Sequence, residues 1–183
     1  MPRSGDEARE RLRNAALELY LEHGYDSTTT AQIAARAHVT ERTYFRHFAD
    51  KREVLFDDGG ALRDVMVTAI AEAPEGTAPL ALVISAYVAA VPLFVAGRPI
   101  AVRRAEVIAA TPALMERAQA KTASLADAVI TALAARGIPE ATARLVAQVG
   151  SAVFERASRE WYPRPRQDLA ALIEKAADEV RAL

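Results

Sequence analysis

The spacing of apolar residues constrains this chain most, because apolar side chains recur every three to four positions almost throughout its 183 residues. Alanine is frequent, and alternating runs of β-branched residues, the pattern of half-buried strands, are absent. The sequence therefore predicts an all-α fold without strands. We expect two domains: a small three-helix domain over residues 1–50 and a larger helical domain over residues 51–183.

Residues that begin and end helices define the elements of the first domain. The first helix is expected over 5–23, where Gly24 can adopt the left-handed conformation that ends a helix. Thr29, followed three positions later by Gln32, has the pattern of a capping box and predicts a second, short helix. After a brief break, Thr40 is the expected N-cap of a third helix, which reaches about Phe48.

The larger domain has equally clear breaks. Asp50, with Glu53 three residues later, predicts a fourth helix that continues through Ile70 to the break at Pro74. Proline at helix starts and glycine just past helix ends mark the boundaries that follow. The remaining helices are expected near 79–96, 99–110, 112–136, 139–161 and 166–182.

Composition limits the possible functions. The chain has no cysteine, which excludes disulfides, thiolate zinc sites and cysteine nucleophiles. The N-terminal residues contain no apolar stretch, so no signal peptide is expected and a cytoplasmic location is predicted. The net charge is −1, and residues 1–58 contain nine Lys and Arg against eleven Asp and Glu, a formal −2. Any binding of nucleic acid must therefore depend on where individual charges lie.

The segment Thr77–Gly97 carries no charge and is long enough to span a membrane. Several of its positions are alanine or glycine, however, and both Pro79 and Pro92 fall within it. A helix that is apolar on all sides can equally be the central helix of a soluble bundle. We favour that second interpretation.

Residues 29–48 predict a helix-turn-helix. Small residues, Ala34 and Ala37, allow its two short helices to cross closely, and Tyr44 and Phe48 direct one face of the second helix into the core. The opposite face suits the major groove, where an arginine can pair with the O6 and N7 atoms of guanine. The candidate DNA-contacting residues are Thr29, Thr30, Glu41, Arg42, Thr43, Tyr44, Phe45, Arg46, His47 and Lys51.

The residues over about 9–56 resemble the TetR family of bacterial regulators. The segments that carry the resemblance are Ala15–Tyr20, His23–Asp26, Thr29-Thr30, Ile33-Ala34, Ala37–Thr40, Thr43–Phe48, Lys51 and Leu55. The resemblance implies an all-helical dimer whose small N-terminal domain binds DNA and whose larger domain binds a small molecule that releases the operator. It also implies that Thr30, His47 and Lys51 contact phosphates, with Arg42, Thr43 and Arg46 near base edges.

Two positions depart from the family pattern. His38 stands in the turn where the family usually has glycine, and histidine tolerates a positive φ better than most residues do. The family also favours an aliphatic residue followed by tyrosine where this chain has Tyr44-Phe45. The phenolic hydroxyl that the family offers to a phosphate is thus missing at position 45.

The larger domain offers less specific signals. Aromatic and arginine side chains on its middle helices are candidates for an apolar pocket with a few polar groups, although for each single residue a core or surface position is favoured over a pocket position. They are Tyr87, Phe94, Arg103, Arg104, Met115, Phe154 and Trp161. By analogy with the family, the helices near 139–161 and 166–182 are expected to form a homodimer interface. Their apolar stripes can alternatively face the core of the same subunit.

Two other classes of function compete with this one. No glycine-rich phosphate loop or nucleophile–base pattern is present, and no two of the three histidines share a helical face, so neither an enzyme nor a metal or cofactor site is predicted. A helical protein-interaction module that has lost DNA binding is the alternative, motivated by the acidic N-terminal balance and by Phe45. The function predicted is a regulator, most simply a repressor, that binds a palindromic operator as a dimer.

Overall fold

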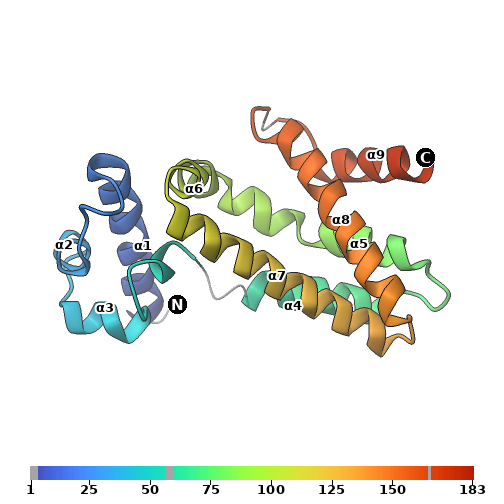
Figure 1. Ribbon diagram of the computed structural model, residues 1–183, viewed down its shortest axis with the longest axis horizontal. Coiled ribbons are helices and arrows are strands. Elements are labelled where there is room, and N and C mark those ends of the chain that lie inside the picture. Colours follow the sequence, from blue (N-terminus) through green and yellow to red (C-terminus); the bar gives the residue numbers. More distant parts are fainter. Residues whose placement is uncertain (1–3, 57–59, 165) are drawn as a thin grey trace. The chain divides into compact units, whose positions relative to one another are not determined.

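Helices form the architecture. The computed structural model describes residues 4–56, 60–164 and 166–183, and within these ranges it contains helices and no strand. The prediction of an all-α fold is confirmed. The elements are α1 (Ser4–His23), α2 (Thr30–Arg36), α3 (Glu41–His47), the 3₁₀ turn η1 (Glu53–Leu55), α4 (Gly60–Glu72), α5 (Pro79–Ala89), α6 (Val91–Ala109), α7 (Pro112–Ala135), α8 (Glu140–Trp161) and α9 (Leu169–Arg181) (Figure 1).

The described residues divide into two compact units. The first, unit 1, combines those of Met1–Asp58 with Ile100–Ala120, and unit 2 combines those of Gly59–Pro99 with Lys121–Leu183. Helices α6 and α7 therefore contribute residues to both units.

The core of unit 1 follows the predicted helical periodicity. Helix α1 packs against α2, α3 and η1. Its expected apolar stripe is buried, namely Leu12, Ala15, Ala16, Leu19 and Tyr20. Gly24 ends α1 at φ 83°, and the Tyr25 ring packs back on Tyr20 with ring centroids 5.2 Å apart. The apolar stripe of this helix and its end at Gly24 were thus predicted correctly from local sequence.

Helix α5 is the central helix of unit 2, where it packs against α4, α8 and α9. Its buried residues are Leu82, Val83, Ile84, Ala86 and Tyr87. The first part of the uncharged segment is therefore a core helix, whereas its second part, the start of α6, is mostly exposed. In the part of the chain that the structure describes, no single helix is long and apolar enough to cross a membrane, although α5 and α6, bent by 55° at their junction, would pass by length and composition as a pair.

The expected continuous helix from Asp50 to Ile70 was wrong. The Asp50 Oδ1 atom does accept hydrogen bonds from the backbone N–H groups of Arg52 (2.7 Å) and Glu53 (3.1 Å). Only the short 3₁₀ helix η1 follows, however, and after Leu55 the backbone is extended at Phe56 (φ −109°, ψ 133°). A separate helix, α4, begins at Gly60.

The break between the next two helices also differs from the expected one at Gly97. Helix α5 ends at Ala89 with Ala90 as its C-cap, and α6 runs from Val91 through Gly97 and Pro99 to Ala109. Pro92 lies in the first turn of α6, where its missing N–H costs a new helix little but would interrupt a continuous one. The proline therefore set the boundary, and the glycine did not.

The last helix begins three residues later than expected, at Leu169. The Asp168 carboxylate accepts a hydrogen bond from the Ala170 N–H at 2.9 Å and caps it. Most of its predicted apolar stripe is buried within unit 2, including Ile173 and Ala177. Much of the α9 stripe therefore faces the core of its own subunit, the alternative that the sequence left open.

Candidate nucleic-acid interface

Two short capped helices, α2 and α3, form the predicted helix-turn-helix. The capping box at the start of α2 is complete, since Thr29 Oγ1 accepts from the Gln32 N–H (3.2 Å) and Gln32 Oε1 accepts from the Thr29 N–H (2.8 Å). Thr40 caps α3 by accepting from the Thr43 N–H at 3.2 Å. Both cap assignments made from sequence are confirmed.

The turn between the helices is a Schellman motif with His38 in its left-handed position. His38 has φ 56°, the only non-glycine residue with positive φ among the described residues. The Val39 N–H donates to the Ala34 carbonyl (3.0 Å) and the His38 N–H to the Ala35 carbonyl (3.1 Å), which satisfies the last carbonyls of α2. The turn therefore keeps the geometry that glycine usually provides.

Tyr44 belongs to the core of the motif. Its side chain is fully buried, and its hydroxyl donates to the Asp50 carbonyl oxygen at 3.0 Å. Burial also raises the pKa of this phenol, with a smaller contribution from the Asp50 charge. The sequence placed Tyr44 both in the core and among the DNA contacts. Because the ring is buried and the hydroxyl is engaged, the structure supports the first role.

The exposed face of α3 is small and defined. Glu41, Arg42, Phe45 and Arg46 are exposed, with 52% of Phe45 accessible. Phe45 and Arg46 follow Arg42 by three and four positions, so both lie beside Arg42 on one face of the helix. This set, which we call the α3 outer face, brings together four of the ten predicted contacts. Thr43 is half-buried beside the Thr40 hydroxyl (3.0 Å), and His47 is half-buried as well.

The hydroxyl of Thr30 is committed within the motif. It donates to the Glu41 carboxylate at 2.6 Å, which joins the first turn of α2 to the first turn of α3. From the sequence, Thr30 was expected to contact a phosphate, and Glu41 was a separate candidate DNA contact. The pair was missed because a hydrogen bond between residues eleven positions apart leaves no periodic signal.

Lys51 lies against the loop that precedes α2. Its Nζ donates to the carbonyls of Tyr25 (2.9 Å) and Thr28 (3.2 Å) and lies 4.1 Å from the centroid of the Tyr25 ring. The ammonium thus holds the loop in place. A phosphate would have to compete with these carbonyl oxygens, so the phosphate contact stays a prediction.

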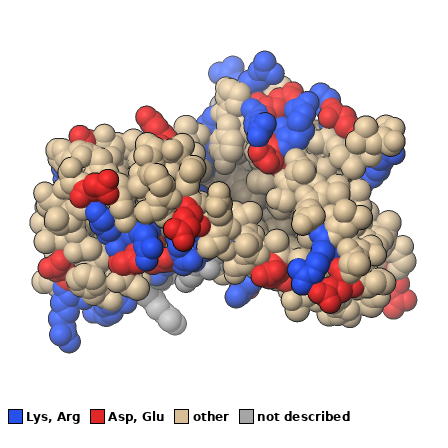
Figure 2. All heavy atoms as spheres, in the orientation of Figure 1, with Lys and Arg blue, Asp and Glu red and all other residues tan. Residues whose placement is uncertain are grey.

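Charges of both signs are interspersed on the face of the molecule shown in Figure 2. Several cations of unit 1 are paired: Arg36 forms a fork with Glu22 (2.9 and 3.2 Å), and Arg52 pairs with Asp50 (2.8 Å). The neighbouring arginine lowers the pKa of Glu22 and that of Asp50. This arrangement agrees with the formal net charge of −2 on residues 1–58. The α3 outer face is therefore the leading candidate for the DNA-binding surface.

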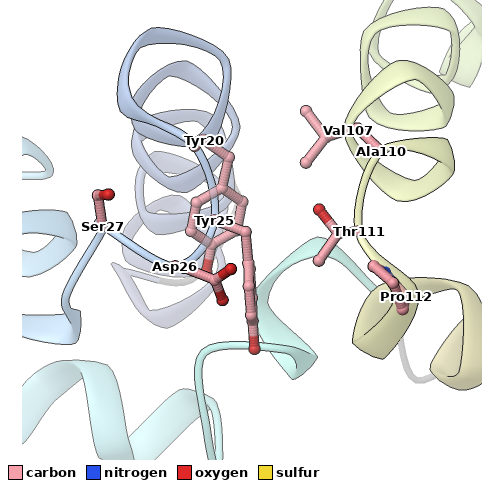
Figure 3. A pocket seen from close by; sticks show the side chains of 9 residues that line it. Tyr20, Tyr25, Asp26, Ser27, Val107, Ala110, Thr111 and Pro112 are labelled. Atoms are coloured by element: carbon pink, nitrogen blue, oxygen red, sulfur yellow. The ribbon is translucent and has the colours of Figure 1, made fainter.

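A cavity of about 320 Å³ lies within unit 1. Figure 3 shows Tyr20, Tyr25, Asp26 and Ser27 on one side and residues of the α6–α7 corner on the other. The corner residues are Val107, Ala110, Thr111 and Pro112. The cavity was not predicted from the sequence, since the two linings are about 80 residues apart in the chain.

The seven predicted pocket residues do not form one cluster within a unit. In unit 2 the rings of Tyr87 and Phe154 stack with their centroids 4.8 Å apart, and the Phe94 ring lies with its centroid 4.5 Å from that of Phe154. Burial raises the pKa of the Tyr87 phenol, which also hydrogen-bonds Ser151. Trp161 is buried under the Arg98 guanidinium, 5.5 Å from its ring centroid.

The other three predicted pocket residues belong to unit 1. Arg103 and Met115 are exposed, and Arg104 donates to the Leu55 carbonyl at 3.4 Å. Nearby, Arg117 of α7 forms a two-pronged ion pair with Glu53 of η1, with Nη2 to Oε2 at 2.8 Å. This pair, which ties η1 to the first turns of α7, was not predicted from the sequence.

The motif consists of two short helices, each capped at its start, and the second helix exposes arginines. This is the arrangement of a DNA-binding protein of the helix-turn-helix class. Comparison with known proteins agrees. Residues 12–57 match the family model "Bacterial regulatory proteins, tetR family". The chain is 33% identical to the HTH-type transcriptional regulator TcmR of Streptomyces glaucescens over 94% of its own length and 82% of that protein. The chain belongs to the TetR family, and it is a DNA-binding transcriptional regulator.

Solved structures show the same fold. The SmeT–triclosan complex superimposes with a TM-score of 0.60 at 22% identity and covers 96% of this chain and 90% of SmeT. Thermus thermophilus FadR in complex with lauroyl-CoA superimposes with a TM-score of 0.55 at 23% identity, over 93% of this chain and 91% of FadR. The resemblance therefore extends beyond the helix-turn-helix to the helical body.

Proposed function

We propose that this protein is a repressor that binds a palindromic operator as a homodimer, reads it with the α3 outer face, and is released by a small apolar effector. The observation that carries the proposal is the exposure of Arg42, Phe45 and Arg46 on one face of a helix that is capped, buried on its other face, and part of a TetR-family chain. Thr43, His47 and Lys51 are supporting contacts in the proposal, and Tyr44 is assigned to the core.

Selection of genomic fragments with the purified protein, followed by binding at several salt concentrations, tests DNA recognition. Arg46→Ala is expected to weaken operator binding by about 1–3 kcal/mol if Arg46 pairs with a guanine. If Arg46 instead contacts a phosphate, the loss is similar for all sequences and the salt slope falls by about one. Arg63→Ala removes the same charge from α4, outside the proposed DNA-binding and dimer surfaces, where Arg63 pairs with Asp64 at 3.3 Å, and is the matched control.

Binding that is indifferent to salt and to Arg46 would contradict the proposal. It would favour the alternative, a helical interaction module, because such a module has no need to displace counterions.

The dimer is proposed to form through α8 together with the half-buried part of α9. Leu145 is 60% exposed, and Val149, Leu172 and Val180 are half-buried on the same pair of helices. A two-fold axis would bring two recognition helices to half-sites about 34–36 Å apart. Leu145→Glu is expected to shift the protein toward monomer in sedimentation and to weaken operator binding. Leu93→Glu changes an exposed leucine (39%) of α6 and should leave both unchanged.

The effector is proposed to bind beside the stacked rings of Tyr87 and Phe154. The cavity there is only about 30 Å³, so a ligand must displace a ring to enter. Apolar walls with the Tyr87–Ser151 hydroxyl pair suit an apolar molecule with one polar group. The ligands that appear in the SmeT and FadR complexes, triclosan and lauroyl-CoA, are both partly apolar, which supports this choice of class.

Release of a fluorescent operator by a panel of apolar compounds, with triclosan as the first probe, tests the effector. Phe154→Ala should change the half-maximal concentration of an active compound several-fold. Ala110→Phe fills the unit 1 cavity (Figure 3) and should not change it. The opposite result would move the effector site to that cavity. Ligand-dependent repression fails if no compound weakens operator binding while the protein stays folded.

A further inference from the structure

Phe45 occupies an unusual place for a large apolar side chain. It is the most exposed phenylalanine among the described residues, and it lies in the middle of the α3 outer face between Arg42 and Arg46. A single exposed apolar residue is ordinary on a protein surface. On a helix face that meets DNA it is not neutral, because it must be buried against whatever the groove offers there.

The chemistry of the side chain restricts what that partner can be. Phenylalanine has no hydrogen-bonding group, so Phe45 can bind neither a phosphate oxygen nor the polar edge of a base. Most of what the bases present in the major groove is donors and acceptors, and the 5-methyl group of thymine is the apolar exception. Contact with that methyl group buries apolar surface on both partners, whereas contact with a donor or acceptor of a base edge leaves a polar group without a partner.

The position of the ring is well defined. Tyr44, which is fixed in the core by its hydrogen bond to Asp50, meets the Phe45 ring edge-on with ring centroids 5.4 Å apart. The arginines at positions 42 and 46 are three residues before and one after Phe45, and they can bind polar base edges or phosphates beside it. The ring is therefore presented from a rigid base between two cations.

We propose that Phe45 reads a thymine methyl group, so that each operator half-site carries a thymine opposite the middle of α3. This inference rests on the proposed DNA recognition by the α3 outer face and specifies part of the sequence that it recognises.

Single replacement of thymine by uracil tests the contact, because it removes only the methyl group. In the operator obtained by selection, each thymine of one half-site is replaced in turn and binding is measured for wild type and Phe45→Ala. We expect one position at which uracil weakens wild-type binding about four-fold, the equivalent of one buried methyl group. Phe45→Ala should bind thymine and uracil equally at that position and keep the wild-type pattern at all others.

Two further measurements separate this contact from a general loss of affinity. Phe45→Leu keeps an apolar group and should keep the uracil penalty. A cytosine at the same position should bind more tightly when it carries a 5-methyl group, for wild type and not for Phe45→Ala. Because Phe45 is exposed, Phe45→Ala should keep the wild-type melting temperature.

The outcomes distinguish this inference from the proposed function. Salt-sensitive operator binding that no thymine-to-uracil replacement weakens, or a uracil penalty that survives in Phe45→Ala, would overturn the thymine contact and leave DNA recognition intact. Failure of the wild type to select any operator would overturn both.

Discussion

The hydroxyl of Tyr44 donates to the carbonyl oxygen of Asp50 at 3.0 Å, and this bond connects the middle of α3 to the segment that follows it. The neighbouring carbonyl, that of Lys51, accepts from Tyr20 of α1 at 2.6 Å. Two buried phenols therefore hold consecutive carbonyls at the end of the helix-turn-helix. The orientation of α3 depends on them, although neither phenol reaches the α3 outer face.

Tyr44→Phe is expected to lower the free energy of unfolding by about 1 kcal/mol, since it removes one hydrogen bond without changing the packing. The melting temperature should fall by about 2–4 °C. Tyr162→Phe, which changes an exposed tyrosine, is the control and should have little effect. The slope of operator affinity against salt should be unchanged in Tyr44→Phe. A slope reduced by about one would show instead that Tyr44 contacts a phosphate.

His38→Gly is expected to stabilise the protein by about 0.5–1 kcal/mol, because it relieves the strain of a non-glycine residue at φ 56° and more than offsets the added freedom of the unfolded chain. Gly24→Ala is the matched opposite. Gly24 has φ 83°, and no atom lies within 4 Å of the position that an alanine Cβ would take, so backbone strain alone should destabilise that variant. Thermal denaturation measures both. A destabilised His38→Gly would mean that the histidine ring makes a contact worth more than the strain.

The helix-turn-helix could be predicted closely from the sequence because its determinants are local. The Thr29 and Thr40 caps, the glycine after α1 and the positive φ of His38 all act within four residues, where residue type alone decides the geometry. The exposed positions on α3 followed from helical periodicity for the same reason. What could not be predicted is the pairing of Thr30 with Glu41.

Elements beyond residue 50 were harder to predict because their signals conflict or act at long range. Asp50 has the pattern of a helix cap, yet only the short 3₁₀ helix η1 follows it, and that helix ends at Leu55. Pro92 and Gly97 both predict a break, and only the structure shows that the break lies next to Pro92. Arg136 binds the carbonyls of Ile70 (2.9 Å) and Ala73 (2.6 Å) at the end of α4, more than 60 residues away, and no local pattern predicts such a contact.

Asp50→Asn is expected to destabilise the protein by about 1 kcal/mol at neutral pH, because the amide cannot replace both carboxylate oxygens, which accept the two backbone N–H groups and the Arg52 guanidinium. The hydrogen bond from Arg52 holds the folded-state pKa of Asp50 below its usual 3.8. The stabilisation is therefore fully present above the unfolded-state value and is lost as pH falls through the folded-state value. Urea denaturation at pH 7 and at pH 3 should show a smaller difference between variant and wild type at the lower pH. An equal difference at both would exclude a role for the charge.

Gly150 of α8 packs directly on Val83 of α5, where a Cβ on residue 150 would overlap the Val83 Cγ1 atom. Gly150→Ala should therefore destabilise the protein by about 1–3 kcal/mol, even though alanine is the better helix former. Gly97→Ala, in a helix position where an added Cβ would meet no atom within 4 Å, should instead be neutral or stabilising by up to about 1 kcal/mol. If the overlap is the cause, Val83→Ala should recover part of the loss in the double variant, so that the two changes together cost less than their sum. Additive losses would mean that the helices already move apart enough to accept a methyl group. Because Tyr87 lies one turn beyond Val83 on α5, such movement would also change the ring that the proposed effector must displace.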